Sequence, residues 1–95
     1  MATFTFHTDA GHGWLEVTTR QLKEVGLTPG DFSAYSYQRR DVLYLEEDVD
    51  ASVFLRTWEA HKGPVRFVER HSNHDHWIRR LDRVVPRAID DDILF

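Results

Sequence analysis

The sequence predicts a single small α+β domain: a mostly antiparallel sheet with two helices on one face, in the order ββαββαββ. Three observations favour this fold. Segments of alternating apolar and polar residues occur in pairs, and helix-start signals follow the first two pairs. Strands and helices therefore do not alternate one for one, as they do in parallel α/β folds. We expect the domain to span residues 1–89 and an acidic, partly apolar tail to occupy residues 90–95.

The first unit has the pattern of a hairpin followed by a short helix. The alternating residues 3–7 predict a half-buried strand, and the glycine-containing residues 9–13 predict a turn. Residues 14–17 then predict the returning strand. Thr18 and Gln21 match a capping box, which indicates that a helix begins there.

The end of this helix is marked by Gly26, because glycine readily adopts the left-handed conformation of a C-terminal cap. Leu27 then stands where it can pack back on Leu22. Residues 28–31 have proline second and glycine third, which predicts a type II turn.

The second unit repeats the hairpin. Residues 33–38 predict a strand with Tyr35 and Tyr37 on one face, and residues 42–46 predict its partner. The charged residues 38–41 are few enough for the connecting turn, although they lack a glycine.

A longer helix is predicted after this hairpin. Asp50 is a favourable N-cap, and Val49 and Phe54 occupy the positions of a hydrophobic staple. Gly63 followed by Pro64 predicts the end of the helix.

The last third of the chain has an ambiguous pattern. Residues 65–69 alternate and predict a strand. The apolar residues between 77 and 85 fit a helical spacing, whereas the order of the first two units favours a third hairpin, which is our interpretation. We expect ten side chains to form one core against the sheet: Phe4, Phe6, Trp14, Leu22, Leu43, Leu45, Phe54, Trp58, Phe67 and Leu81.

Composition limits the function classes. The chain has no cysteine, which excludes disulfides and thiolate metal sites. It has no apolar run of membrane-spanning length and no basic start followed by an apolar stretch, so we expect a cytoplasmic protein without a membrane partner. No nucleophile elbow, P-loop or dinucleotide-binding turn occurs, which predicts a non-enzyme that needs no cofactor. Monomer and homodimer both stay open.

Charge is distributed unevenly around a net charge of -4. Five of the ten residues 41–50 are acids, and Asp48 and Asp50 suit the positive end of a helix dipole. The tract is therefore either a helix start or a protein-binding surface. We predict a protein with a basic groove as the partner, contacted by Glu46, Glu47, Asp48, Tyr37, Arg39 and Arg40.

Two alternatives remain. Arginines in the last third could contact phosphates of a nucleic acid; they are Arg66, Arg70, Arg79, Arg80 and Arg83. Histidines in turns could hold a metal ion; they are His7, His12, His71, His74 and His76. The histidine spacing matches no established zinc motif, so we expect no bound metal.

Three segments carry a resemblance. Residues 7–17 (HTDAGHGWLEV), 33–37 (SAYSY) and 44–48 (YLEED) together resemble a group of small proteins encoded by bacteriophages, plasmids and other mobile elements. The resemblance covers about residues 3–60 and brings no assigned chemistry. It implies a bacterial cytoplasm and the inhibition of a host defence component, as anti-CRISPR proteins do.

Overall fold

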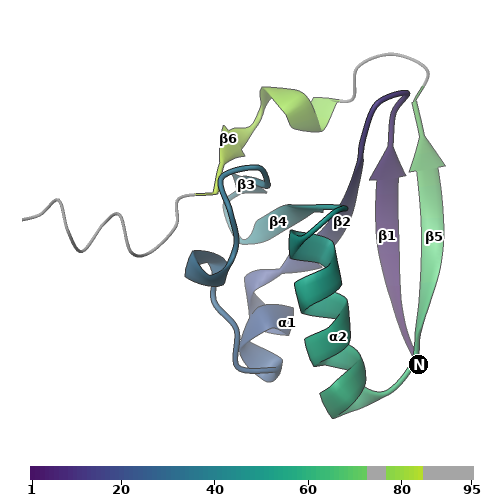
Figure 1. Ribbon diagram of the computed structural model, residues 1–95, viewed down its shortest axis with the longest axis vertical. Helices are drawn as coiled ribbons and strands as arrows, with labels where there is room; N and C mark the ends of the chain where they lie inside the picture. The colour runs from purple at the N-terminus through teal and green to yellow at the C-terminus, as the bar shows by residue number, and fades with distance from the viewer. Residues whose placement is uncertain (73–76, 85–95) are drawn as a thin grey trace, which may run out of the picture.

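The computed structural model describes residues 1–72 and 77–84; the predicted tail at residues 90–95 lies outside them. Six strands form one sheet in the order β5-β1-β2-β4-β3-β6 (Figure 1). All neighbours are antiparallel except β1 and β5, which are parallel. The strands are β1 Ala2–Thr8, β2 Gly13–Thr18, β3 Tyr37–Arg39, β4 Val42–Glu46, β5 Val65–His71 and β6 Asp82–Arg83. The α-helices are α1 Thr19–Glu24 and α2 Asp50–Lys62, and the 3-10 helices are η1 Pro29–Asp31 and η2 Trp77–Arg80.

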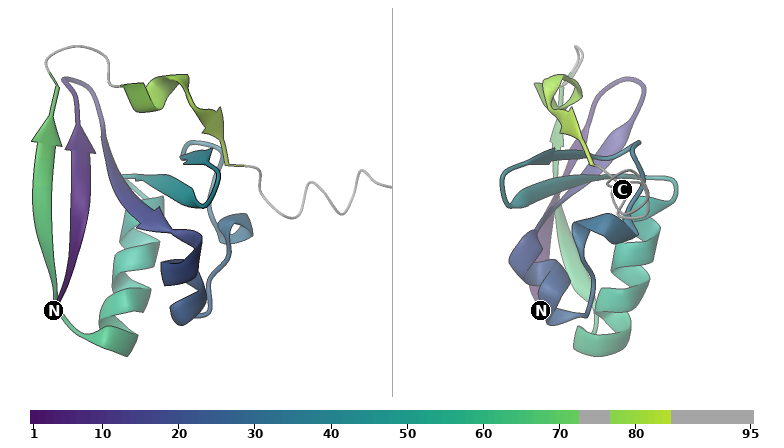
Figure 2. Two further views of the ribbon diagram at one scale, coloured as in Figure 1. Left: turned by 180° about the vertical axis from the view of Figure 1, so that it is seen from behind. Right: turned by 90° about the vertical axis from the view of Figure 1, so that its left-hand side faces the viewer.

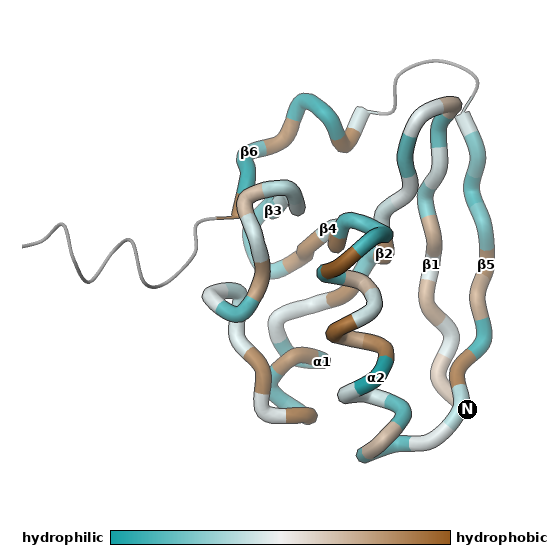
Figure 3. Tube along the Cα trace, in the orientation of Figure 1, coloured by the Kyte–Doolittle hydropathy of each residue, from teal (hydrophilic) through white to brown (hydrophobic). Residues whose placement is uncertain are grey.

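Both α-helices cover the same face of the sheet, as the right-hand view of Figure 2 shows, so the predicted α+β architecture is confirmed. Hydrophobic positions on α1, α2 and β4 supply this core (Figure 3). Phe4 of β1 meets Phe54 and Trp58 of α2 edge-on, with ring centroids 5.4 and 5.2 Å apart. Such contacts add to the stabilisation from burial alone.

The opposite face of the sheet holds a second apolar cluster, under η2. It consists of Trp14, Tyr37, Tyr44 and Ile78. The prediction of one core is therefore wrong for Trp14 and Leu81, which pack on this second face, and for Phe67, which is 52% exposed. The physical reason is that β2 and β4 carry apolar residues on both faces, and only the tertiary fold decides what covers the second one.

The local helix signals are confirmed. The capping box of Thr18 and Gln21 is present in both directions. At the other end of α1, Gly26 has φ 79°, and the amide of Leu27 donates to Leu22 O at 2.9 Å, as in a Schellman motif. Gly63 ends α2 with φ 91°.

One turn prediction and one strand boundary are wrong. Pro29–Asp31 form η1, with Thr28 as its N-cap, rather than a type II turn, and Gly30 is not among the positive-φ glycines. The strand predicted at residues 33–38 begins only at Tyr37, so Tyr35 is 72% exposed while Tyr37 is buried. Residues 33–36 form a turn instead, because their polar side chains bind α2.

The predicted cap and staple of α2 are also wrong. The Asp50 carboxylate makes no capping hydrogen bond; it accepts from the Ser33 amide at 2.9 Å and from the Ser33 and Ser36 hydroxyls. Val49 is 62% exposed and so forms no staple with Phe54. Long-range polar partners thus replace the local capping pattern.

The final segment contains both of the structures that its sequence could predict, since η2 is helical and β6 is a strand. The predicted third hairpin is nevertheless wrong. β6 pairs with β3, and β5 pairs along its whole length with β1. The two strands therefore lie at opposite edges of the sheet.

Phe54→Ala and Phe67→Ala form a matched pair that tests the core. Phe54 is fully buried between the helices and the sheet, so its truncation should lower the free energy of unfolding by about 3–5 kcal/mol. The same change at the half-exposed Phe67 should cost a small fraction of that. Urea unfolding of dilute protein measures both; equal losses would contradict the packing described above.

Candidate binding groove

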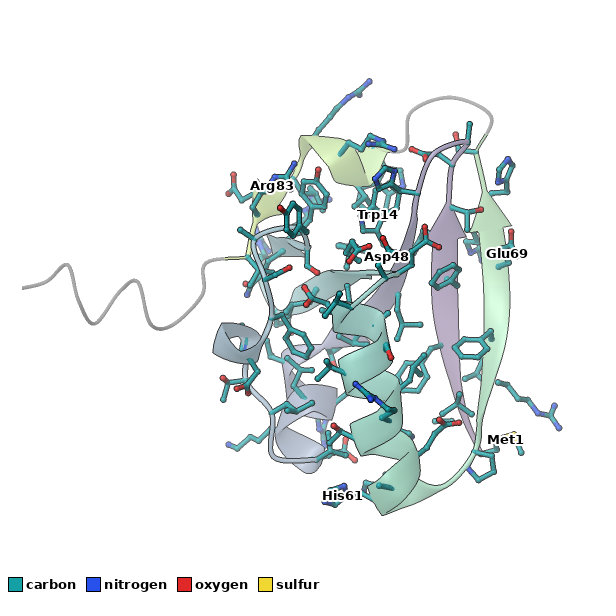
Figure 4. The ribbon with its side chains drawn as sticks, viewed as in Figure 1. Met1, Trp14, Asp48, His61, Glu69 and Arg83 are labelled. Carbon is teal, nitrogen blue, oxygen red and sulfur yellow. The ribbon has the colours of Figure 1, made fainter. Side chains whose placement is uncertain are left out.

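A groove of about 370 Å³ lies between the β4–α2 loop and the η2–β6 segment. Trp14 and Tyr37 form its floor, with ring centroids 6.2 Å apart. Tyr35 and Val49 stand exposed at its rim. Figure 4 shows the labelled Trp14, Asp48 and Arg83 near one another at this end of the molecule.

One wall of the groove is held by an ion pair whose carboxylate is buried and whose guanidinium is partly exposed. Arg79 Nε donates to Asp9 Oδ2 at 2.7 Å and Nη2 donates to Oδ1 at 3.0 Å, a bidentate arrangement. The same carboxylate accepts from the amides of Gly11 and His12. The guanidinium carbon lies 5.1 Å from the Trp14 ring centroid. Asp9 thus shapes the β1–β2 turn and also fixes η2, which follows it by 70 residues.

Arg83 continues this cationic wall. Its guanidinium carbon lies 4.7 Å from the Tyr37 ring centroid, and Nη1 donates to the backbone oxygen of Ala34 at 3.0 Å. In residues 1–72 and 77–84 no carboxylate forms a salt bridge with Arg83. Its remaining N–H donors are therefore available to a carboxylate or carbonyl in the groove.

The facing wall is acidic. Glu46 is 9% exposed, and its carboxylate accepts from the amides of Asp48 at 2.7 Å and Val49 at 3.3 Å. Glu46 therefore fixes the loop that precedes α2, because both of these amides lie before the first residue of the helix. Only Glu47 and Asp48 of the predicted acidic surface present exposed carboxylates, so that surface is smaller than the sequence suggests.

The structure does not gather the predicted contact residues into one surface. Tyr37 lines the groove but is only 6% exposed. Arg39 and Arg40 are exposed at the turn between β3 and β4, where Arg40 replaces the missing glycine with φ 56°. The length of β4 separates this turn from Asp48 by about 13 Å or more.

Sequence reasoning missed Trp14, Arg79 and Arg83 as members of one site. The sequence pattern predicts Trp14 in the core and places the two arginines in a set that could contact phosphates. The aromatic-cation stacking that unites them joins segments more than 45 residues apart, as the contact of Arg83 with Ala34 at a separation of 49 illustrates. No pattern within a short stretch of sequence predicts such a contact.

The predicted histidine set is only partly described, because His74 and His76 lie outside the described residues. His7 Nε2 lies 2.7 Å from Glu16 Oε1, and His71 Nδ1 lies 2.8 Å from the Thr8 hydroxyl. The described residues contain no group of three histidine or acidic side chains that could hold a metal ion.

Comparisons with protein-family models, curated proteins and solved structures give no match for the chain. Within the described residues, no helix is long and apolar enough to cross a membrane.

Tyr44, next to Tyr37 on the same sheet face, offers a pH test of this face. Burial and then the Glu16 carboxylate raise the pKa of Tyr44 above 10.0, while Arg39 opposes them. The folded state thus keeps the phenolic proton where the unfolded state has lost it, so stability should fall as pH rises above about 10. Glu16→Gln should lower this pKa and Arg39→Gln should raise it. Ultraviolet titration referenced to Tyr44→Phe measures both; shifts in the same direction would contradict the arrangement.

Proposed function

We propose that the chain is a protein-binding module and that the groove receives a segment of its partner. One observation carries the proposal: a cationic wall and an acidic wall face each other across an aromatic floor. A polypeptide segment offers both charge signs together with apolar groups, and so complements all three surfaces. A nucleic acid backbone is uniformly negative and would meet the carboxylates of the acidic wall.

The fixed walls of the groove support this proposal. Arg79 is held by two hydrogen bonds to Asp9, and Glu46 is held by two backbone amides. A site whose charges are already positioned loses less conformational entropy on binding. The exposed Tyr35 at the rim is of the residue type most often found at the energetic centre of protein interfaces.

The partner that we propose is a bacterial host protein, as the resemblance to mobile-element proteins implies, and binding would inhibit it. Glu47 and Asp48 would contact basic side chains of that protein. Arg83 would contact a carboxylate or backbone carbonyl. The required partner surface thus contains a basic residue and an acceptor on one projecting segment.

A nucleic-acid-binding role is the second candidate, on the sheet face opposite the helices. Arg66 and Arg70 of β5 lie beside Thr3 and His7 of β1 on this face. The exposed Arg39 of β3 and Arg83 of β6 belong to the same face. Phosphate contacts by such residues release counterions and give a steep dependence of affinity on salt. A salt titration therefore separates the two candidates.

Asp48→Lys tests the groove, and Glu59→Lys is its matched control. Both residues are exposed acids, but Glu59 lies on α2 outside the groove. The partner is first captured from a bacterial lysate with the wild-type chain and identified, and its affinity for each variant is then measured by calorimetry. Asp48→Lys should weaken binding at least tenfold, about 1.4 kcal/mol, because it sets a cation against the basic partner.

Tyr35→Ala should weaken binding similarly without changing net charge, while Glu59→Lys should leave the affinity unchanged. Because Asp48 and Tyr35 are exposed, neither change should alter the free energy of unfolding by more than about 0.5 kcal/mol. Full affinity in both groove variants would refute the proposal.

A further inference from the structure

The strand β5 lies at one edge of the sheet. Its inner edge pairs with β1 over seven consecutive residue pairs, from Val65 to His71. Among the described residues no strand pairs with its outer edge. The outward N–H and C=O groups of such a strand are a template for pairing with another strand.

Three common protections of an edge strand, namely lysine, proline and a bulge, are missing from β5, whose charged residues are Arg66, Glu69 and Arg70. Its register with β1 is uninterrupted. Phe67 is 52% exposed on the helix side and Val68 is 47% exposed on the other side. Beside Phe67 lies an apolar hollow of about 320 Å³ bordered by Phe6 and Leu55.

We propose that β5 pairs antiparallel with β5 of a second copy of this chain, about a two-fold axis through Phe67. A two-fold axis perpendicular to the sheet places one residue of β5 directly opposite the same residue of the second copy. The choice of this central residue fixes the register of the pairing. Only three choices of central residue pair five or more residues of β5 with the second copy, and they are Phe67, Val68 and Glu69.

Charge selects among these three registers. A centre at Val68 would set Arg66 opposite the partner's Arg70 twice, and a centre at Glu69 would set two carboxylates opposite each other. Like charges directly opposite each other destabilise a strand pair. A centre at Phe67 avoids this, because Arg66 then lies opposite the partner's Val68 and the two Phe67 rings meet on the helix side.

The proposed dimer would leave both binding grooves open. The groove is bordered by β6, at the far edge of the sheet from β5. Two copies joined along β5 would form one continuous sheet with a groove near each end. Such a dimer could engage a repeated or dimeric partner with higher avidity than a single chain. The pairing itself does not depend on the proposed function of the groove.

Light scattering coupled to gel filtration tests the dimer directly. The wild-type chain should have about twice the mass of 11.2 kDa at high micromolar concentration and should dissociate on dilution. Phe67→Lys should give the single-chain mass at every concentration, because it sets two ammonium groups together at the axis. Tyr35→Lys, an equal change at another exposed aromatic residue, should remain dimeric. A monomeric wild type, or a dimeric Phe67→Lys variant with native circular dichroism, would overturn the proposal.

Single-cysteine variants test the register, since the chain has no cysteine of its own. In the register centred on Phe67, the two Phe67→Cys thiols lie on residues directly opposite each other, within reach of a disulfide. Glu69→Cys thiols lie four residues out of register, about 13 Å along the strands. Mild oxidation should therefore cross-link two chains of the Phe67→Cys variant. The Glu69→Cys and Val68→Cys variants should remain as single chains. Cross-linking at either of these positions but not at 67 would overturn the proposed register.

Discussion

The buried Asp50 carboxylate is the interaction on which the other features of the structure depend. It accepts hydrogen bonds from the Ser33 amide and from the hydroxyls of Ser33 and Ser36. Ser36 in turn accepts from the Glu46 amide at its hydroxyl and from the Val84 amide at its backbone oxygen, both at 2.9 Å. Four segments thus meet at one carboxylate and one serine: the loop before β3, the end of β4, the start of α2 and the residue after β6.

This meeting point positions the groove. The end of β4 and the start of α2 carry its acidic wall, the loop before β3 carries Tyr35, and the segment joined through Val84 carries Arg83. The pair of Asp9 and Arg79 ties the other end of the same C-terminal segment to the β1–β2 turn. Two buried carboxylates therefore hold η2 over the second sheet face and β6 at the edge of the sheet. Buried carboxylates are retained only where donors satisfy them, which explains why these loops are fixed.

The sequence predicts those features that depend on contacts between residues close together in the chain. The capping box at Thr18, the left-handed Gly26 and the alternation of the strands all depend on contacts within a few residues, and these predictions are confirmed. Asp50 satisfies the local rule for an N-cap equally well, but donors 14 and 17 residues away bind it more completely. The groove unites residues from both ends of the chain, so its walls could be predicted singly and not as one site.

A double-mutant cycle between Ser36→Ala and Asp50→Asn tests the central claim most directly. If the serine and the carboxylate act as one unit, each single change should destabilise the fold, and the second should add little. Urea unfolding should then give a coupling free energy of about 1.5–3 kcal/mol, the range for hydrogen bonds to charged groups. Losses that add within about 0.5 kcal/mol would show two independent residues and contradict the account.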